Sequence, residues 1–134
     1  MTEAVAGLLD TSVFIARKSG RPLDTAALPA ESLVCVITLA ELHAGVLAAE
    51  HTEVRSRRMA TLEFAVSLDP LPVDAAAAQR WATLRVRLAE EGRRAKLNDL
   101  WIAAVAQANG LPVVSQDDDF DTIEAVGGPA VIRV

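Results

Sequence analysis

Short apolar runs recur along the chain, and segments with apolar residues at helical spacing separate them. The runs are "AGLLD" at 6–10, "SLVCVI" at 32–37, "LPVVS" at 111–115 and "PAVIRV" at 129–134. They do not alternate apolar with polar residues, which is typical of strands that are covered on both faces of a parallel sheet. We therefore predict that these four runs are the strands of one buried sheet.

The segments between these runs favour helices. Several begin after a residue suited to an N-cap and end near a glycine. The predicted helices are residues 11–19, 38–50, 52–68, 74–92, 98–110 and a short piece at 120–126. Residues 69–74, "DPLPVD", are predicted to form a loop with room for a brief strand. Strands that alternate with helices predict an α/β fold, a three-layer sandwich with a mainly parallel central sheet.

Length and composition set limits on the class of protein. The 134 residues suit a single domain spanning 1–134, and a hydrophobic fraction of 51% with 23% charged residues supports a packed core. The N-terminal "MTEAV" lacks the basic region of a secretory signal, and the apolar runs fall short of the roughly 20 residues of a membrane helix. We therefore expect a cytoplasmic protein with no membrane partner. The single cysteine, Cys35, is expected to be a small buried hydrophobe.

The net charge of -5 argues against a protein that grips nucleic acid through a general basic surface. Basic residues nevertheless gather in two stretches. They are Arg55, Arg57 and Arg58 in the first and Arg85, Arg87, Arg93, Arg94 and Lys96 in the second. Two interpretations stay open for them: solvated helix faces, or local contacts with phosphate groups.

Acidic residues follow the predicted strands. Asp10 ends the first run, Glu41 comes in the helix after the second, and the run from Asp117 to Asp119 follows the third. Asp99 lies at the start of the late apolar helix. Because the carboxyl ends of parallel strands meet at one edge of a sheet, these acids are expected to converge there.

Each acid also has a purely structural interpretation. Asp10 would cap a helix, Glu41 would complete a capping box with Thr38, and Asp99 would favour a helix dipole. The run at 117–119 would be a solvated turn. However, four acids at one edge would repel one another, and burial would raise their pKa values. A hard divalent cation removes that conflict, and Mg²⁺ or Mn²⁺ prefers carboxylate oxygens.

Other catalytic patterns are missing from the sequence. It contains no G-x-G-x-x-G after a strand, no Walker A sequence and no G-x-S-x-G, which disfavours dinucleotide binding, P-loop chemistry and α/β-hydrolase chemistry. The two histidines, His43 and His51, have no partners at zinc-site spacing, and we expect structural roles for both.

Four segments together resemble a known family. "LLDTSVFI", "VITLAELHAGV", "LNDLWIAAVAQANGLPVVS" and "DDDF" resemble, in order and spacing, the signatures of the PIN domain. Within that family they are most similar to VapC-type toxins of bacterial toxin–antitoxin pairs, and the resemblance covers essentially the whole chain. It implies an endoribonuclease that depends on Mg²⁺ or Mn²⁺, is inhibited by a cognate antitoxin and forms a homodimer.

The resemblance also implies which residues act. Asp10, Glu41 and Asp99 match the family's first three acids, and the fourth is Asp117 or Asp119, with Asp117 placed first and Asp118 pointing away. Asp10 and Asp99 would bind the metal directly, whereas Glu41 and the fourth acid would act through water or a second ion. Thr11 or Ser12 would orient Asp10 by hydrogen bonding.

Substrate and partners follow from the same resemblance. The substrate would be RNA, with a structured tRNA or rRNA recognised by its shape, and the products would carry 5′-phosphate and 3′-hydroxyl ends. Arg17, Lys18, Arg93, Arg94 and Lys96 are candidates for contacts with the RNA backbone. Apolar residues in 54–68 and 98–108 suggest a twofold dimer interface, and the helices at 11–16 and 38–47 are expected to line the antitoxin's groove.

Two rival functions stay open at this level. One is a different metal-dependent nuclease or a phosphatase that uses the same acids, although a haloacid-dehalogenase-like phosphatase would need an acid where Ser12 stands. The other is a non-catalytic α/β domain that binds a partner and uses its acids only as helix caps. Metal-dependent cleavage of RNA, compared with DNA, distinguishes all three.

Overall fold

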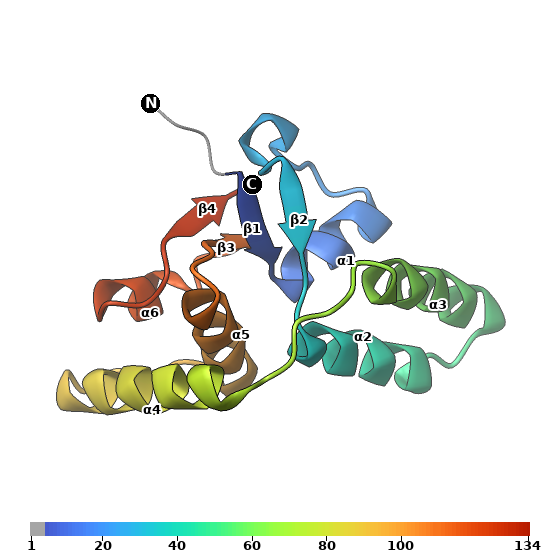
Figure 1. Ribbon diagram of the computed structural model, residues 1–134. Coiled ribbons are helices and arrows are strands. Elements are labelled where there is room, and N and C mark those ends of the chain that lie inside the picture. Colours follow the sequence, from blue (N-terminus) through green and yellow to red (C-terminus); the bar gives the residue numbers. More distant parts are fainter. Residues whose placement is uncertain (1–4) are drawn as a thin grey trace.

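A four-stranded parallel sheet forms the centre of the protein in the computed structural model, which describes residues 5–134 (Figure 1). The strands are β1 (Ala6–Leu9), β2 (Glu31–Leu33), β3 (Val113–Ser115) and β4 (Val131–Arg133). Their order is β2-β1-β3-β4, so β1 and β3 are neighbours at the middle of the sheet although more than half of the chain separates them. Both strands end at the same edge, where the candidate site lies.

The central strands are buried on both faces, as the continuous apolar runs predict. Leu8, Val113 and Val114 have no exposed surface. Gly7 allows β1 and β3 to pack closely, because a Cβ atom at this position would lie 2.7 Å from a methyl group of Val114. The register pairs Leu8 with Leu33 of β2 on one side and with Val113 of β3 on the other.

Helices cover both faces of the sheet. On one face α1 (Thr11–Ser19), α2 (Val36–Ala48) and α3 (Thr52–Val66) bury a cluster that includes Val13, Phe14 and Val114. On the other, α4 (Ala75–Glu90), α5 (Leu97–Ala108) and the short α6 (Asp121–Ala125) enclose Leu84, Ile102 and Phe120. A 3-10 turn, η1 (Thr25–Ala27), precedes β2. The predicted three-layer α/β fold is confirmed.

The predicted boundary between the second strand and the next helix is wrong. The strand was expected to continue through residue 37, but β2 ends at Leu33 and α2 begins at Val36, with Cys35 as its N-cap. Thr38 therefore lies inside the helix and is fully buried, so the predicted capping box between Thr38 and Glu41 does not form. The apolar residues after β2 pack against the core from a helix, and this tertiary contact overrides their β propensity.

Other local predictions are confirmed. Asp74 caps α4 by accepting a hydrogen bond from the amide of Ala77 at 2.9 Å, and Gly20 ends α1 with a φ of 74°. The brief strand expected in 69–74 is an isolated bridge between Leu71 and Cys35, and Cys35 itself is buried. In the described part of the chain, no helix is long and apolar enough to cross a membrane.

Candidate active site

Asp10 is the most buried acid at the carboxyl edge of the sheet. It follows β1 directly and is only 4% exposed. It is the N-cap residue of α1, but its side chain makes no capping hydrogen bond. Instead, Oδ2 accepts hydrogen bonds from the hydroxyls of Ser12 at 2.6 Å and Ser115 at 2.9 Å. The carboxylate is therefore turned toward neighbouring side chains of the edge rather than toward the helix backbone.

Ser115 connects two of the candidate acids. It is the last residue of β3 and has no exposed surface. Its hydroxyl lies 2.9 Å from Oδ2 of Asp10 and 3.2 Å from Oδ1 of Asp117, so its single proton serves one carboxylate at a time. Ser115 was not among the residues predicted from the sequence. The available signal was a hydroxyl at the end of an otherwise apolar strand.

Glu41 reaches the same region from α2. Its Oε1 accepts a 2.6 Å hydrogen bond from the hydroxyl of Thr11, the residue after Asp10. That hydroxyl also lies 3.1 Å from the hydroxyl of Thr38. The structural interpretation of Glu41 as half of a capping box is therefore replaced by a tertiary contact that holds Glu41 beside the start of α1.

Asp99 lies in the first turn of α5, where an acid also suits the helix dipole. One of its oxygens, Oδ2, is buried and has no hydrogen-bond partner among the described residues. The pKa of Asp99 is raised to about 7, mainly by burial and also by the negative charges of Asp10 and Asp119, while the Lys96 ammonium acts in the opposite direction. An unsatisfied buried carboxylate oxygen is costly, and the dipole alone does not explain it.

The acidic run after β3 divides into three different environments. Asp117 is half-buried and faces Ser115, whereas Asp118 is exposed. Asp119 accepts a hydrogen bond from the Lys96 ammonium at 2.8 Å, and this contact raises the pKa of Lys96. The structure thus places Asp117 next to Asp10 and ties Asp119 to a cation.

Burial also raises the pKa of Asp10. The hydrogen bonds from Ser12 and Ser115 oppose this effect, while the negative charge of Asp117 adds to it. Two of the edge carboxylates, Asp10 and Asp99, therefore resist ionisation, which is the signature of acids held close together in partial burial.

The acids do not form one ligand set as the side chains stand, and only Asp10 and Asp117 share a hydrogen-bonding partner. Within residues 5–134, no group of three or more histidine, cysteine, aspartate or glutamate side chains is close enough to hold a metal ion as the side chains stand. Instead, Ser115 lies between Asp10 and Asp117, while Thr11 donates to Glu41 and Ser12 donates to Asp10. The two histidines, His43 and His51, are exposed and lie on α2 and just before α3.

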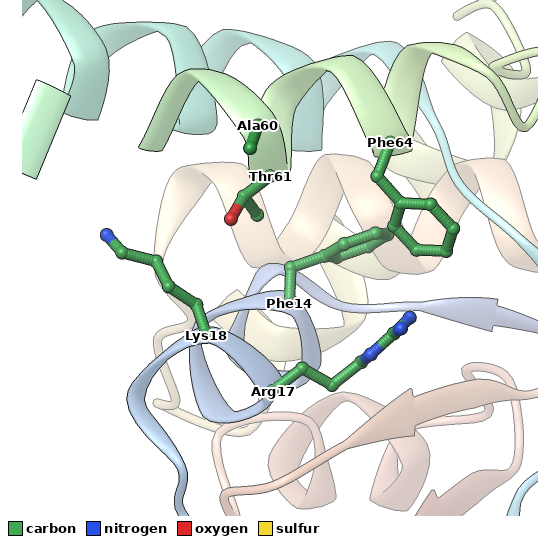
Figure 2. A pocket seen from close by; sticks show the side chains of 6 residues that line it. All are labelled: Phe14, Arg17, Lys18, Ala60, Thr61 and Phe64. Carbon is green, nitrogen blue, oxygen red and sulfur yellow. The ribbon is translucent and has the colours of Figure 1, made fainter. Parts of the chain in front are cut away.

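Two cavities open between α1, α2 and α3, and we call them together the α1–α3 groove. The first, of about 340 Å³, is lined by Thr11, Ile15, Lys18, Glu41, Leu42 and Arg58, among others. The second, of about 250 Å³, is lined by Phe14, Arg17, Lys18, Ala60, Thr61 and Phe64. Figure 2 shows Phe14 and Arg17 of α1 extending toward Phe64 of α3, while Lys18 points away from the two rings. Since Glu41 lines the first cavity, the groove leads to the acidic edge.

The fold and the site define a small parallel α/β domain with an acidic centre at the carboxyl edge of its sheet. The chain belongs to the PIN-domain family, whose profile matches residues 7–126. Because the match includes every strand but β4 and all four acidic segments, the family assignment rests on the same residues as the site.

Individual relatives agree with this assignment. The chain is 54% identical over 133 residues to Ribonuclease VapC5 of Mycobacterium tuberculosis, an alignment that covers 99% of this chain and 98% of the relative. It is 40% identical over 113 residues to Ribonuclease VapC4 of the same species, covering 84% and 87%. The crystal structure of VapBC-5 from Mycobacterium tuberculosis, a member of the VapBC family of toxin–antitoxin systems, matches with a TM-score of 0.89 and 52% identity, covering 97% of this chain and 99% of that chain.

Proposed function

We propose that this protein is the toxin of a toxin–antitoxin pair and acts as an endoribonuclease that depends on Mg²⁺ or Mn²⁺. The observation that carries the proposal is the buried Oδ2 of Asp99, which has no hydrogen-bond partner within residues 5–134, on a carboxyl whose pKa is raised by burial and by the charge of Asp10. The 54% identity to a relative named as a ribonuclease, over nearly the full length of both chains, supports the reaction class.

The residues at the edge fit a hard divalent cation. All the donors that the site offers are carboxylate and hydroxyl oxygens, which Mg²⁺ and Mn²⁺ prefer. Asp10 and Asp99 would bind the ion directly, and Glu41 and Asp117 would bind through water or support a second ion. Burial, with a smaller contribution from neighbouring negative charges, raises the pKa values of Asp10 and Asp99, and a bound cation would oppose this by stabilising the ionised carboxylates.

Each side chain of the site would have its own role in the reaction. When bound, the divalent ion supplies positive charge to the phosphate oxygens and lowers the pKa of water. Ser12 and Ser115 hold Asp10 in one orientation and favour its ionised form, through the hydrogen bonds described above. Glu41 or Asp117 positions the attacking water in line with the scissile bond. Water adds to phosphorus, the bond to the 3′ oxygen breaks and that oxygen takes a proton, giving 5′-phosphate and 3′-hydroxyl ends.

The partner would be a cognate antitoxin seated in the α1–α3 groove. Apolar Ile15 and Leu42 suit an apolar segment of the antitoxin, and Glu41 suits a guanidinium sent toward the acids. The substrate would be a structured RNA such as a tRNA or rRNA, because no described feature reads a base directly. Expression of the chain alone is expected to stop bacterial growth, and co-expression of the antitoxin to restore it unless the antitoxin's C-terminal segment is deleted.

A homodimer is also proposed, but one of its two predicted surfaces is unsuitable. The residues from Ile102 to Ala106 in α5 are fully buried in the chain's own core, so these five residues are not available to a second copy. In α3, Met59, Phe64 and Val66 are between 38% and 51% exposed and remain available to a second copy. Light scattering is expected to give the mass of a dimer at micromolar concentration.

The experiment that tests the function compares two neutralised acids. Asp99→Asn keeps the shape of the side chain and removes its charge, and we expect RNA cleavage in Mg²⁺ to fall by about 100-fold or more. Asp118→Asn is the matched control, because Asp118 lies in the same acidic run but is exposed; it should cleave at the parental rate. Parental cleavage by Asp99→Asn would mean that Asp99 only stabilises its helix.

The same assay separates the rival functions by substrate. A DNA of the same sequence and a phosphomonoester are tested beside the RNA, under the same metal concentration. Cleavage of RNA alone supports the proposal. Preferential cleavage of DNA or of the monoester would indicate another nuclease or a phosphatase, and no turnover of any substrate by the folded parent would indicate a binding domain.

A further inference from the structure

A basic groove lies on the opposite side of the fold from the α1–α3 groove, at the end of α4 and the start of α5. It has a volume of about 710 Å³ and is lined by Arg85, Val86, Arg93, Arg94 and Leu100, among others. We call it the α4–α5 groove. Its rim carries three guanidinium groups and its wall is aliphatic, with Val86 58% exposed.

These arginines have little compensating negative charge. Within residues 5–134, neither Arg85 nor Arg94 forms a salt bridge. The guanidinium of Arg85 lies over the Trp81 ring at 5.5 Å, an arrangement that leaves its N–H edge available. Arg93 approaches Glu91 only to 3.9 Å, and both side chains are about half exposed, so this pair is weak. The groove is thus a positive patch on a protein whose net charge is -5.

The α4–α5 groove leads to the acidic edge through the first turn of α5. Leu100, which lines the groove, follows Asp99 directly. Ala95 also lines it and precedes Lys96, whose ammonium lies 2.8 Å from Asp119. A phosphate chain that approaches the acids is repelled by them, and a cationic track beside them offsets that repulsion and steers the substrate.

The cations of the α1–α3 groove are less suited to phosphate. Arg58 donates a 2.6 Å hydrogen bond to the carbonyl of Gly45, so part of its guanidinium is already engaged. Of the two basic regions, the one at the α4–α5 groove therefore has the more available positive charge.

We propose that the α4–α5 groove binds the sugar–phosphate backbone of the RNA substrate, with phosphates on Arg85, Arg93 and Arg94 and with ribose against the aliphatic wall. This inference rests on the proposed ribonuclease function and names where its substrate lies. Guanidinium groups suit the role because they bind phosphate through two parallel hydrogen bonds. Lys96 lies between the α4–α5 groove and the acids.

Two double variants with the same loss of charge test this proposal. Arg93→Gln with Arg94→Gln removes two rim charges, and Arg57→Gln with Arg80→Gln removes two exposed charges outside the groove. Binding of bulk tRNA is measured by fluorescence anisotropy between 50 and 200 mM KCl, in an Asp99→Asn background so that the RNA stays intact. We expect the rim variant to bind about tenfold more weakly and to lower the slope of log K against log salt by about one to two. The control should change less than about twofold.

Cleavage and partner assays complete the test. With Asp99 restored, the rim variant should raise KM and leave kcat within about threefold, because the acids are untouched. Equal losses of tRNA affinity in both double variants, or parental tRNA binding by the rim variant, would contradict the proposed role of the α4–α5 groove. Loss of antitoxin binding with tRNA binding retained would assign the groove to an acidic protein segment instead. If the parent binds tRNA through these arginines but never cleaves RNA, only the proposed catalytic function fails.

Discussion

The hydroxyl of Ser115 donates a hydrogen bond to Oδ2 of Asp10 at 2.9 Å, joining two residues that are 105 positions apart in sequence. The bond ties the end of β3 to the end of β1, the two central strands of the sheet. The same hydroxyl lies 3.2 Å from Asp117. Ser115 therefore fixes the orientation of one carboxylate and sets its distance from a second.

Replacing Ser115 with alanine should impair catalysis without unfolding the protein. Ser115→Ala removes one donor to Asp10 and leaves Ser12, so the pKa of Asp10 should rise further and its affinity for Mg²⁺ should fall. We expect RNA cleavage to drop by about 10- to 100-fold, as for other residues that orient metal ligands. The pH at half-maximal rate should also move upward. Ser67→Ala, at an exposed helix end, is the control, and a parental pH profile in Ser115→Ala would contradict this role.

The fourth acid is predicted to be Asp117 and not Asp119. Asp117 shares the Ser115 hydroxyl with Asp10, whereas Asp119 is held by the Lys96 ammonium at 2.8 Å. Asp117→Asn should therefore lower kcat for RNA cleavage by about 100-fold, and Asp119→Asn by less than about tenfold. Single-turnover cleavage rates measure both effects. The opposite order of the two variants would make Asp119 the fourth acid.

Asp99 should make stability depend on pH in protein freed of metal. Its pKa is about 7 in the folded protein and near the ordinary 3.8 in the unfolded chain, so the folded state binds the extra proton between these values. The free energy of unfolding should therefore fall as the pH rises from about 4 to about 7, and level off above that. Asp99→Asn removes the titrating carboxyl group and with it this fall in the free energy of unfolding. In urea denaturation with EDTA it should be more stable than the parent at pH 8 and similar at pH 4.5.

An exposed acid outside the buried edge provides the control for the pH dependence of stability. Asp118→Asn, at an exposed position with no such environment, should leave the difference between pH 4.5 and pH 8 unchanged. An Asp99→Asn variant that is less stable than the parent at pH 8 would show that the charged carboxylate is satisfied in the folded protein.

Much of the fold was predictable because local pattern and global burial agree. The continuous apolar runs identify β1 and β3, since strands covered on both faces have no polar side. Asp74 and Gly20 mark helix ends by backbone chemistry that is local to them. The hydrophobic pattern predicts the wrong boundary between β2 and α2, because β-branched Val36 and Ile37 favour an extension of the strand. Packing of these residues against the core sets the start of α2, and the local sequence does not indicate this tertiary contact.

The acids of the candidate site were predictable, and so was the Ser12 hydroxyl that donates to Asp10 at 2.6 Å, but Ser115 was not. The sequence places four charged residues at the edge of a buried sheet, where charge is costly without a partner, and this identifies Asp10, Glu41, Asp99 and Asp117. Ser115 carries no charge, and its contact with Asp10 depends on a strand order in which β1 and β3 are neighbours. That order arises from packing of residues far apart in the chain. The apolar face of α5 was misassigned to a dimer interface because composition does not tell a buried core helix from an interface helix.

The most direct test of the account is RNA cleavage by protein stripped with EDTA and then titrated with Mg²⁺ or Mn²⁺. The acids at the edge of the sheet are predicted to need a cation, so the stripped protein should be inert. Either metal should restore cleavage of RNA, while a DNA of the same sequence stays intact. Equal RNA cleavage in EDTA and in saturating metal would contradict the central claim, since the buried carboxylates of Asp10 and Asp99 would then act without the ion that the account assigns to them.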